Sequence, residues 1–270
     1  SDVSATLDIL RLLGCRVERE EDTVTIDASG LNRWDIPEYL MREMRSSVIF
    51  LGALLARLGT AELSYPGGCE LGPRPIDLHL STLRALGAEI LEEQGALCCR
   101  GRKKSLQGRE VCLPIPSVGA TENAMLAACG CPGLTTIVGA AQEPEIVDLQ
   151  NFLQAMGAQV RGAGTPTVSI QGGVPLHPAR YRVMGDRIAA ATYLCAAAAA
   201  QGEVELTGVS PDTLTAVLAC LYRFRPHCFD LCRAPAGHQR GAYCPLPRLS
   251  DRRTGHSYGR FGRRRGRDPL

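Results

Sequence analysis

One helical pattern occurs three times in the sequence and decides the fold. Residues 80–90 read LSTLRALGAEI, residues 7–17 read LDILRLLGCRV, and residues 149–160 read LQNFLQAMGAQV. In each copy apolar residues recur at helical spacing, a glycine follows in the position of a left-handed C-terminal cap, and a strand-forming segment comes next. The three glycines are 73 and 70 residues apart. The chain is therefore predicted to repeat one structural unit about every seventy residues.

A second helix alternates with the first at the same period. It is predicted over residues 44–58, 121–129 and 188–200, and the last copy leads into a predicted strand at 203–206. Two independent helices that keep one period argue against chance similarity. Each unit therefore holds two helices with intervening strands, an α/β arrangement in which helices cover sheet faces. A fourth helix of the first type is predicted from Pro211 to Leu221, but no Gly-Ala-x-Val segment follows it.

Charge divides the chain near residue 222. Residues 1–222 carry 18 Lys and Arg against 25 Asp and Glu, whereas residues 223–270 carry 12 Arg against 3 Asp. The final segment has four leucines and no Val, Ile, Met or Glu, so it cannot bury enough apolar surface to offset its ordering entropy. We expect it to be disordered or out of frame. Its arginines could bind nucleic acid electrostatically, but no recognisable module indicates specific recognition.

Cysteine usage and the absence of targeting signals predict a cytoplasmic protein. The sequence has 12 cysteines, yet it is long for a disulfide-stapled domain and opens without a secretory signal. Cys98-Cys99 and Cys129-x-Cys131 lack partners at zinc-finger spacing. No apolar stretch reaches the roughly 18 to 20 residues of a membrane helix. Reduced thiols, no structural zinc and no membrane association are expected.

A glycine-rich loop holds the candidate reactive group. Residues 65–75 read YPGGCELGPRP, which predicts an exposed loop around Cys69. A guanidinium at Arg74 would tune the thiol, although the cysteine could also be incidental to a turn. His79 follows Asp77 at a helix start, and one such histidine is more often structural than catalytic. The chain has no P-loop, no GxGxxG after a strand, no HExxH and no GxSxG.

Two further loops occupy matching places at the starts of second-type helices. Residues 116–123 read PSVGATEN, and the first N–H groups of this helix could bind an anion such as phosphate. On its own the pattern favours ordinary capping by Ser117 or Thr121. One repeat earlier, Arg45 is either a solvated surface charge or a ligand for an anionic substrate.

Together these loops resemble the UDP-N-acetylglucosamine 1-carboxyvinyltransferase family of enolpyruvyl transferases. The resemblance is carried by MRxS at 44–47, PGGC at 66–69, GxRPxDL at 72–78, PSVGATEN at 116–123, EPEIVD at 143–148 and DRI at 186–188. It covers residues 1 to about 221, and the PGGC loop followed by RPxD is highly specific. A sister family of the shikimate pathway shares the fold but not this cysteine loop.

The resemblance implies an inside-out α/β barrel of repeated βαβαββ units. Residues 1–183 would form a first domain that lacks its N-terminal segment, and residues 184–222 the start of a second. The implied reaction transfers the enolpyruvyl group of phosphoenolpyruvate to the 3-hydroxyl of UDP-N-acetylglucosamine, the first committed step of peptidoglycan synthesis. That chemistry requires no metal and no organic cofactor.

The resemblance also implies roles for individual residues. Cys69 would be the general acid that protonates C3 of phosphoenolpyruvate, and the thiol that fosfomycin alkylates. Contacts with UDP-N-acetylglucosamine are implied for Arg45, Arg74, Pro75, Ile76, Asp77, Leu78, Ser117, Val118 and Gly119. Arg74 would also lie near phosphoenolpyruvate, and the backbone amides of residues 117–119 would cradle the diphosphate.

Some groups of that family have no match here. Its members carry a Lys-Asn pair before the matching region, and an acidic base and further arginines in the second domain. We therefore hypothesise that this chain does not turn over by itself, because transition-state stabilisation depends on groups acting together. Three rival hypotheses are a non-catalytic UDP-sugar-binding fragment, an arginine-tailed protein that associates with nucleic acid, and a relative of the shikimate-pathway transferase.

Overall fold

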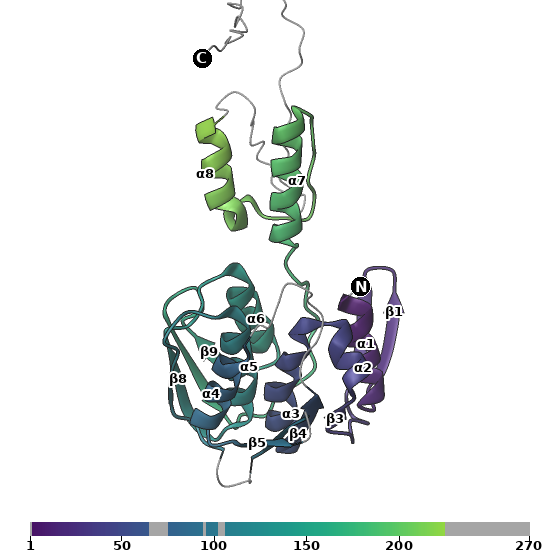
Figure 1. Ribbon diagram of the computed structural model, residues 1–270, viewed down its shortest axis with the longest axis vertical. Coiled ribbons are helices and arrows are strands. Elements are labelled where there is room, and N and C mark those ends of the chain that lie inside the picture. The colour runs from purple at the N-terminus through teal and green to yellow at the C-terminus, as the bar shows by residue number, and fades with distance from the viewer. Residues whose placement is uncertain (1, 65–74, 94–95, 102–105, 225–270) are drawn as a thin grey trace, which may run out of the picture. The chain divides into compact units, whose positions relative to one another are not determined.

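The computed structural model describes residues 2–64, 75–93, 96–101 and 106–224 (Figure 1). The chain divides into two compact units, Ser1–Val183 and Met184–Leu270. The predicted cysteine loop, with Cys69 and Arg74, and the arginine-rich segment 225–270 lie outside the described residues.

The first unit holds two copies of a strand–helix–strand–helix–strand–strand repeat. The first copy comprises β3 (Asp35–Ile36), α2 (Glu38–Glu43), the 3-10 helix η1 (Arg45–Ile49), α3 (Phe50–Leu58), β4 (Thr60–Ser64), α4 (Asp77–Ala85), β5 (Glu89–Glu93) and β6 (Ala96–Arg100). The second copy comprises β7 (Glu110–Cys112), α5 (Val118–Gly130), β8 (Gly133–Val138), α6 (Pro144–Ala155), β9 (Gln159–Arg161) and β10 (Thr167–Gly172). Before them, α1 (Asp2–Leu12), β1 (Arg16–Glu20) and β2 (Thr23–Asp27) have the helix–strand–strand order with which each copy ends.

The two copies have the same sheet topology. Their strand orders are β3-β4-β6-β5 and β7-β8-β10-β9. In each sheet the first two strands are parallel and the other neighbours antiparallel. The paired central positions of both sheets are buried apolar residues: Ile36, Leu63 and Leu97 in the first, and Val111, Ile137 and Val168 in the second. An α/β arrangement of repeated units is thus present, as the sequence predicts.

The seventy-residue period is confirmed at the ends of the first-type helices. These helices are α1, α4 and α6, and the glycines that follow them are Gly14, Gly87 and Gly157. All three have left-handed backbones, with φ of 98°, 99° and 93°. A residue with a Cβ is strained there, so the sequence uses glycine to end the helix and turn toward the next strand.

Helix α5 is the central helix of the first unit. It is apolar on almost every side, and Glu122 is its only charged residue, as expected of a helix enclosed by its neighbours. It packs on α3, α4, α6 and β10, and Figure 1 shows these helices grouped together with β8 and β9 on their outer side. The approach to α3 is close, because a Cβ on Gly130 would lie 2.5 Å from the Cα of Ala56.

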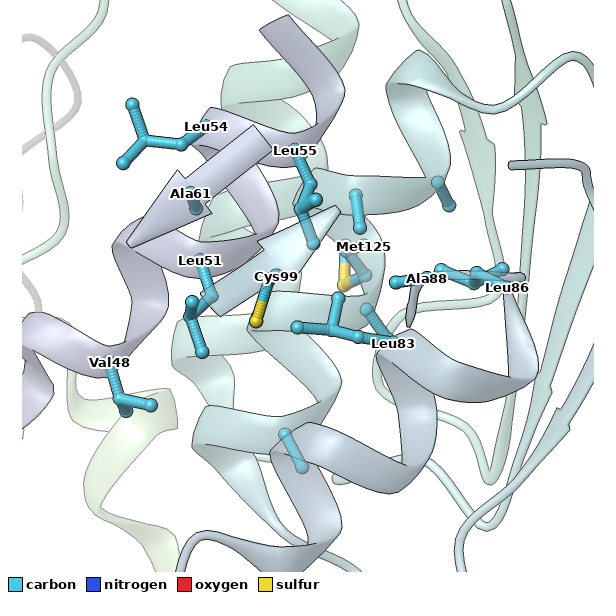
Figure 2. Packing of buried hydrophobic residues seen from close by; sticks show 14 of the residues in the cluster. Val48, Leu51, Leu54, Leu55, Ala61, Leu83, Leu86, Ala88, Cys99 and Met125 are labelled. Carbon is cyan, nitrogen blue, oxygen red and sulfur yellow. The ribbon is translucent and has the colours of Figure 1, made fainter. Parts of the chain in front are cut away.

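One hydrophobic core joins the two copies. In Figure 2, Leu51 and Leu55 of α3, Leu83 of α4, Cys99 of β6 and Met125 of α5 surround a common centre. All five are almost fully buried, and burying a large aliphatic side chain stabilises a fold by roughly 1.5–3 kcal/mol. The helix ends of the first unit are therefore held on a rigid scaffold.

The described part of the second unit consists of α7 (Arg187–Ala200), the 3-10 helix η2 (Pro211–Leu214) and α8 (Thr215–Phe224). Asp186 caps α7 by accepting the N–H groups of Ile188 and Ala189, both at 2.9 Å. The strand predicted at 203–206 is wrong, because Leu206 makes only an isolated bridge and the described part of this unit offers no strand to pair with. Among the described residues, no helix is both long and apolar enough to cross a bilayer.

Candidate phosphate-binding site

Three elements that carry predicted site residues converge on the start of α5. Helix α5 packs on both η1 and α4, and the buried side chain of Asn123 joins all three. Its Oδ1 accepts the N–H of Gly52 at 2.6 Å, and its Nδ2 donates to the carbonyl of Val48 at 3.1 Å and lies 3.2 Å from Nδ1 of His79. A buried amide is costly unless its hydrogen bonds are satisfied. Asn123 therefore holds the η1–α3 segment, α4 and α5 in one arrangement.

The N-terminus of α5 is capped only in part. Ser117 is the N-cap, and its Oγ accepts the N–H of Ala120 at 3.4 Å, while Oγ1 of Thr121 donates to the Ser117 carbonyl at 2.8 Å. The N–H groups of Val118 and Gly119 belong to the first turn and have no acceptor within the helix. Ser117 therefore caps the helix, and among the described residues no acceptor is recorded for the N–H groups of Val118 and Gly119.

The segment before α4 presents both exposed and buried side chains. Pro75 and Asp77 are exposed, whereas Ile76 is 7% exposed and belongs to the core, and Leu78 packs against that core. Side chains of Ile76 and Leu78 thus fix the start of the helix. Any contact of Ile76 with a ligand would have to come from its backbone, whereas the half-buried side chain of Leu78 could also contribute.

A positive charge lies close to the histidine of this site. Arg45 is half-buried at the start of η1. Burial, and then the charge of Arg45, lower the pKa of His79 to about 4, while Asp77 acts in the opposite direction. His79 is therefore an uncharged ring at neutral pH, and Arg45 supplies the positive charge of the site.

The buried cysteines are unsuited to nucleophilic chemistry. Burial raises the pKa of Cys99 to about 12 and the pKa values of Cys129 and Cys131 to about 11, so these groups stay protonated thiols. The described cysteines include free thiols at positions 15, 99, 112, 129, 131, 195 and 220. The predicted general acid, Cys69, lies outside these residues, so its role stays a prediction.

Sequence reasoning missed two residues of this site. It gave Asn123 no role and took His79 to be structural. A signal was available, because an amide within an alanine-rich helix must find buried partners or lose stability. Gly119 and Asn123 are also four residues apart, which places them on one face of α5.

A cavity of about 520 Å³ lies elsewhere, over strands β8, β9 and β10, and it contains none of the predicted site residues. Arg161, Ser169 and Gln171 contribute to its lining. In the part of the chain that the structure describes, no cluster of His, Cys, Asp and Glu could hold a metal ion.

Comparisons with known proteins agree with this architecture. The family model for EPSP synthase (3-phosphoshikimate 1-carboxyvinyltransferase) matches residues 1–224. Among solved structures, the enolpyruvyl transferase NikO from Streptomyces tendae matches with a TM-score of 0.71 at 22% identity, over 91% of this chain and 58% of its own. EPSP synthase from Acinetobacter baumannii matches with a TM-score of 0.62 at 27% identity, over 82% of this chain and 51% of its own.

Curated relatives are more similar in sequence. UDP-N-acetylglucosamine 1-carboxyvinyltransferase 2 of Caldanaerobacter subterraneus subsp. tengcongensis is 47% identical over 220 residues, covering 82% of this chain and 52% of the relative. The UDP-N-acetylglucosamine 1-carboxyvinyltransferase of Shewanella amazonensis is 45% identical over 222 residues with the same coverage. The chain spans about half the length of these relatives. Since the family model covers most of its 270 residues, the chain belongs to the EPSP synthase (3-phosphoshikimate 1-carboxyvinyltransferase) family of enolpyruvyl transferases.

Proposed function

We propose that this protein transfers the enolpyruvyl group of phosphoenolpyruvate to the 3-hydroxyl of UDP-N-acetylglucosamine, in peptidoglycan synthesis. The observation that carries the proposal is the convergence of Arg45, the start of α4 and the first-turn N–H groups of α5 around Asn123. Donors at a helix N-terminus suit a phosphate, and a nearby guanidinium adds charge-assisted attraction. The names of the curated relatives indicate that this phosphate belongs to a sugar nucleotide.

The sugar-nucleotide side of the site is formed by the described residues. The diphosphate contacts the N–H groups of Val118 and Gly119 and the hydroxyl of Ser117, and Arg45 neutralises part of its charge. Pro75 and Asp77 are exposed at the start of α4, where they contact the rest of the nucleotide together with Leu78 and the backbone of Ile76.

The chemical step uses groups beyond the described residues. The sugar hydroxyl loses its proton to a base and adds to C2 of phosphoenolpyruvate, while the Cys69 thiol gives its proton to C3. Phosphate then leaves C2 as a proton leaves C3, which restores the double bond. Arg74 lies near phosphoenolpyruvate in this proposal. No metal or organic cofactor takes part.

We infer that the complete domain closes as an inside-out α/β barrel. The support is that two copies with one topology lie against a shared layer of helices around α5. We also place the reaction in the cytoplasm, since both substrates are cytoplasmic metabolites and free thiols suit a reducing compartment. Specific nucleic-acid binding is not part of the proposal.

Calorimetric titration of the 270-residue chain tests the substrate. UDP-N-acetylglucosamine is expected to bind, and shikimate 3-phosphate is not. Binding should weaken about tenfold in Gly119→Ala, because a Cβ at this position would lie 2.9 Å from Cε1 of His79 and disturb the first turn of α5. The exposed Ser81→Ala on α4 is the control. Binding of shikimate 3-phosphate in place of the sugar nucleotide would overturn the proposal.

Turnover is tested separately. Phosphate release from phosphoenolpyruvate should depend on UDP-N-acetylglucosamine in a complete protein of this family and should be lost in Cys69→Ala. Release by the 270-residue chain alone would contradict the hypothesis that this chain does not turn over by itself. Release that persists in Cys69→Ala would remove the cysteine from the mechanism.

A further inference from the structure

The cavity of about 520 Å³ lies over the outward face of the sheet that contains β8, β10 and β9. On the other face of this sheet, Val160 and Ile170 are buried in the core. Because side chains alternate along a strand, Gln159, Arg161 and Gln171 point outward, and all three are exposed. A volume of this size is typical of sites for small molecules. The cavity therefore offers polar side chains of a sheet face to a ligand.

The strand register arranges these side chains in two rows. Arg161 lies directly opposite Ser169, and Gln159 lies directly opposite Gln171. Side chains paired in this way have Cβ atoms roughly 4.5–5.5 Å apart, and the two rows, two residues apart along each strand, are separated by about 6.7 Å. The exposed Leu134 is the partner of Gln171 on the other side. One row thus presents a guanidinium and a hydroxyl, and the other presents two amides beside an apolar side chain.

Helix α6 closes the cavity at the edge of the sheet. Strand β9 stands at the end of the strand order, and Nε2 of Gln154 donates to the carbonyl of Val160 in this strand at 2.7 Å. Gln154 and Ala158 both line the cavity. At this point the carbonyl that β9 could offer to an added strand is already used. A ligand would therefore lie on the face of the sheet and not along its edge.

The charged and amide side chains of the lining are available to a ligand. Within the described part of the chain, Arg161 forms no ion pair, and neither Gln159 nor Gln171 forms a side-chain hydrogen bond. The residues that line the cavity include one cation and no acidic residue. A single guanidinium suits a carboxylate, which it can bind through two parallel hydrogen bonds. Side-chain amides both donate and accept, so their natural partner is another amide.

The first repeat has different residues at the same place in its sheet. Leu91 occupies the position of Arg161, and Glu89 lies opposite Arg100 where the second repeat has its two glutamines. The two sheets nevertheless have the same strand order. The scaffold therefore does not require a guanidinium beside a pair of amides, and this combination belongs to the second repeat.

We propose that this cavity binds the carboxylate end of a short, extended peptide. Arg161 and Ser169 hold the terminal carboxylate, the two glutamines pair with the peptide group two residues earlier, and Leu134 contacts the apolar side chain that precedes this group. The spacing matches, because an extended peptide advances by the same distance of about 6.7 Å per two residues as the strands beneath it. This site lies apart from the phosphate site, and the inference does not rest on the proposed function.

Calorimetric titration with N-acetyl-Leu-Ala-Ala tests the inference, since the terminal carboxylate is the only charge of this peptide. The 270-residue chain is expected to bind the acid about tenfold more tightly than the same peptide with a C-terminal amide. Arg161→Gln should bind both forms as weakly as the parent binds the amide. Gln171→Ala should bind both forms about threefold more weakly and keep the preference for the acid, because Gln171 contacts the peptide group and not the carboxylate.

Arg109→Gln is the matched control, because Arg109 is an exposed arginine that does not line the cavity. It should keep the affinity and the preference of the parent. Equal affinity of the parent for acid and amide, or equal affinity of the parent and Arg161→Gln for the acid, would overturn the inference. A preference lost in Arg45→Gln and kept in Arg161→Gln would place the peptide at the phosphate site and overturn it as well.

Nitrogen-15 NMR of the parent chain provides a test that needs no variant. The side-chain amide signals of Gln159 and Gln171 and the Nε–H signal of Arg161 should shift when the peptide acid is added, and saturating UDP-N-acetylglucosamine should not prevent these shifts. Unchanged signals at saturating peptide would refute the inference. If the peptide shifts these signals but UDP-N-acetylglucosamine does not bind, the proposed function fails while the peptide site stands.

Discussion

The two repeats of the first unit have one topology but start their second-type helices differently. In the first repeat, η1 and α3 follow one another, no side chain caps η1, and Arg45 stands at its first position. In the second repeat, Ser117 caps a continuous α5 and the first-turn residues are Val118 and Gly119. The first helix start thus supplies a guanidinium, and the second supplies backbone donors.

This difference shows how a duplicated scaffold can form one site. Two sheets of the same topology bring the starts of η1 and α5 close together. The local sequence then places a charged side chain at one start and backbone donors at the other. Asn123 fixes the two starts to each other through Gly52 and Val48. Four substitutions should have separate and measurable effects: one removes this link, one disturbs the close helix packing, one replaces the half-buried acid of α5, and one removes the charge of η1.

The largest effect is expected from Asn123→Ala. The substitution leaves the N–H of Gly52 and the carbonyl of Val48 buried without partners, and it should lower the free energy of unfolding by about 3 kcal/mol. Urea denaturation followed by circular dichroism measures this loss. Gln142→Ala removes an exposed amide and serves as the control. Equal stability of Asn123→Ala and the parent would show that the two repeats do not depend on this link.

A somewhat smaller effect is expected from Gly130→Ala. The added Cβ would lie 2.5 Å from the Cα of Ala56, so α3 and α5 must move apart. Overpacking of this kind costs about 1–3 kcal/mol, and we expect about 2 kcal/mol in urea denaturation. Gly202→Ala is the matched control, because nothing lies within 4 Å of a Cβ at that position. A loss as large in the control would point to backbone effects and not to helix packing.

The acid of α5 should make stability depend on pH. Burial first, and then the charge of Glu145, raise the pKa of Glu122 to about 7 from an ordinary value of 4.5. The protonated form is favoured in the folded state, so its stabilisation is complete below pH 4.5 and is lost as pH rises through 7. Between pH 5 and pH 8 the parent should therefore lose roughly 2 kcal/mol relative to Glu122→Gln.

Comparing the two proteins at each pH removes the contribution of His79. The pKa of this ring is lowered in the folded state, so its stabilisation is lost as pH falls from 6.5 toward 4 in both proteins alike. If the stability difference between the parent and Glu122→Gln did not change with pH, the carboxyl of Glu122 would have an ordinary pKa.

The smallest effect is expected from Arg45→Gln, which removes the charge of the first helix start. UDP-N-acetylglucosamine should bind about fivefold to tenfold more weakly, without a measurable change in stability, because Arg45 is only half-buried. Calorimetry at low and high salt provides the measurement. The difference between parent and variant should shrink at high salt, and Arg57→Gln on α3 is the control. A salt-independent difference would indicate a packing role for Arg45.

Much of the fold could be predicted from sequence because the repeat contains residues with strong preferences for a particular backbone conformation. Gly14, Gly87 and Gly157 mark helix ends, since left-handed backbone nearly requires glycine. Local residue preferences could not show whether residues 203–206 form a strand, because a strand needs a neighbouring strand to pair with, and the local sequence does not reveal one. The period alone could not specify the order of the strands within each sheet.

The sequence could indicate candidate residues for the proposed site, but not the contacts that join the elements on which they lie. Arg45, Asp77 and Gly119 were selected from motifs that are each short and local, and all three lie on elements that meet at α5. Hydrogen bonds between residues 71 and 75 positions apart hold these elements together, through Asn123 with Gly52 and Val48. Such long-range partners cannot be derived from one sequence without a fold.

The first turn of helix α5, where we propose that phosphate binds, is half-exposed, and most of the helix beyond it is enclosed by the core. Its N-terminus therefore cannot fray independently, and local opening there requires disruption of the whole unit. A phosphate compound present at one hundred times its dissociation constant would then stabilise the entire unit by about 2.7 kcal/mol. Amide hydrogens as distant as those of β8 should exchange more slowly when this compound is bound.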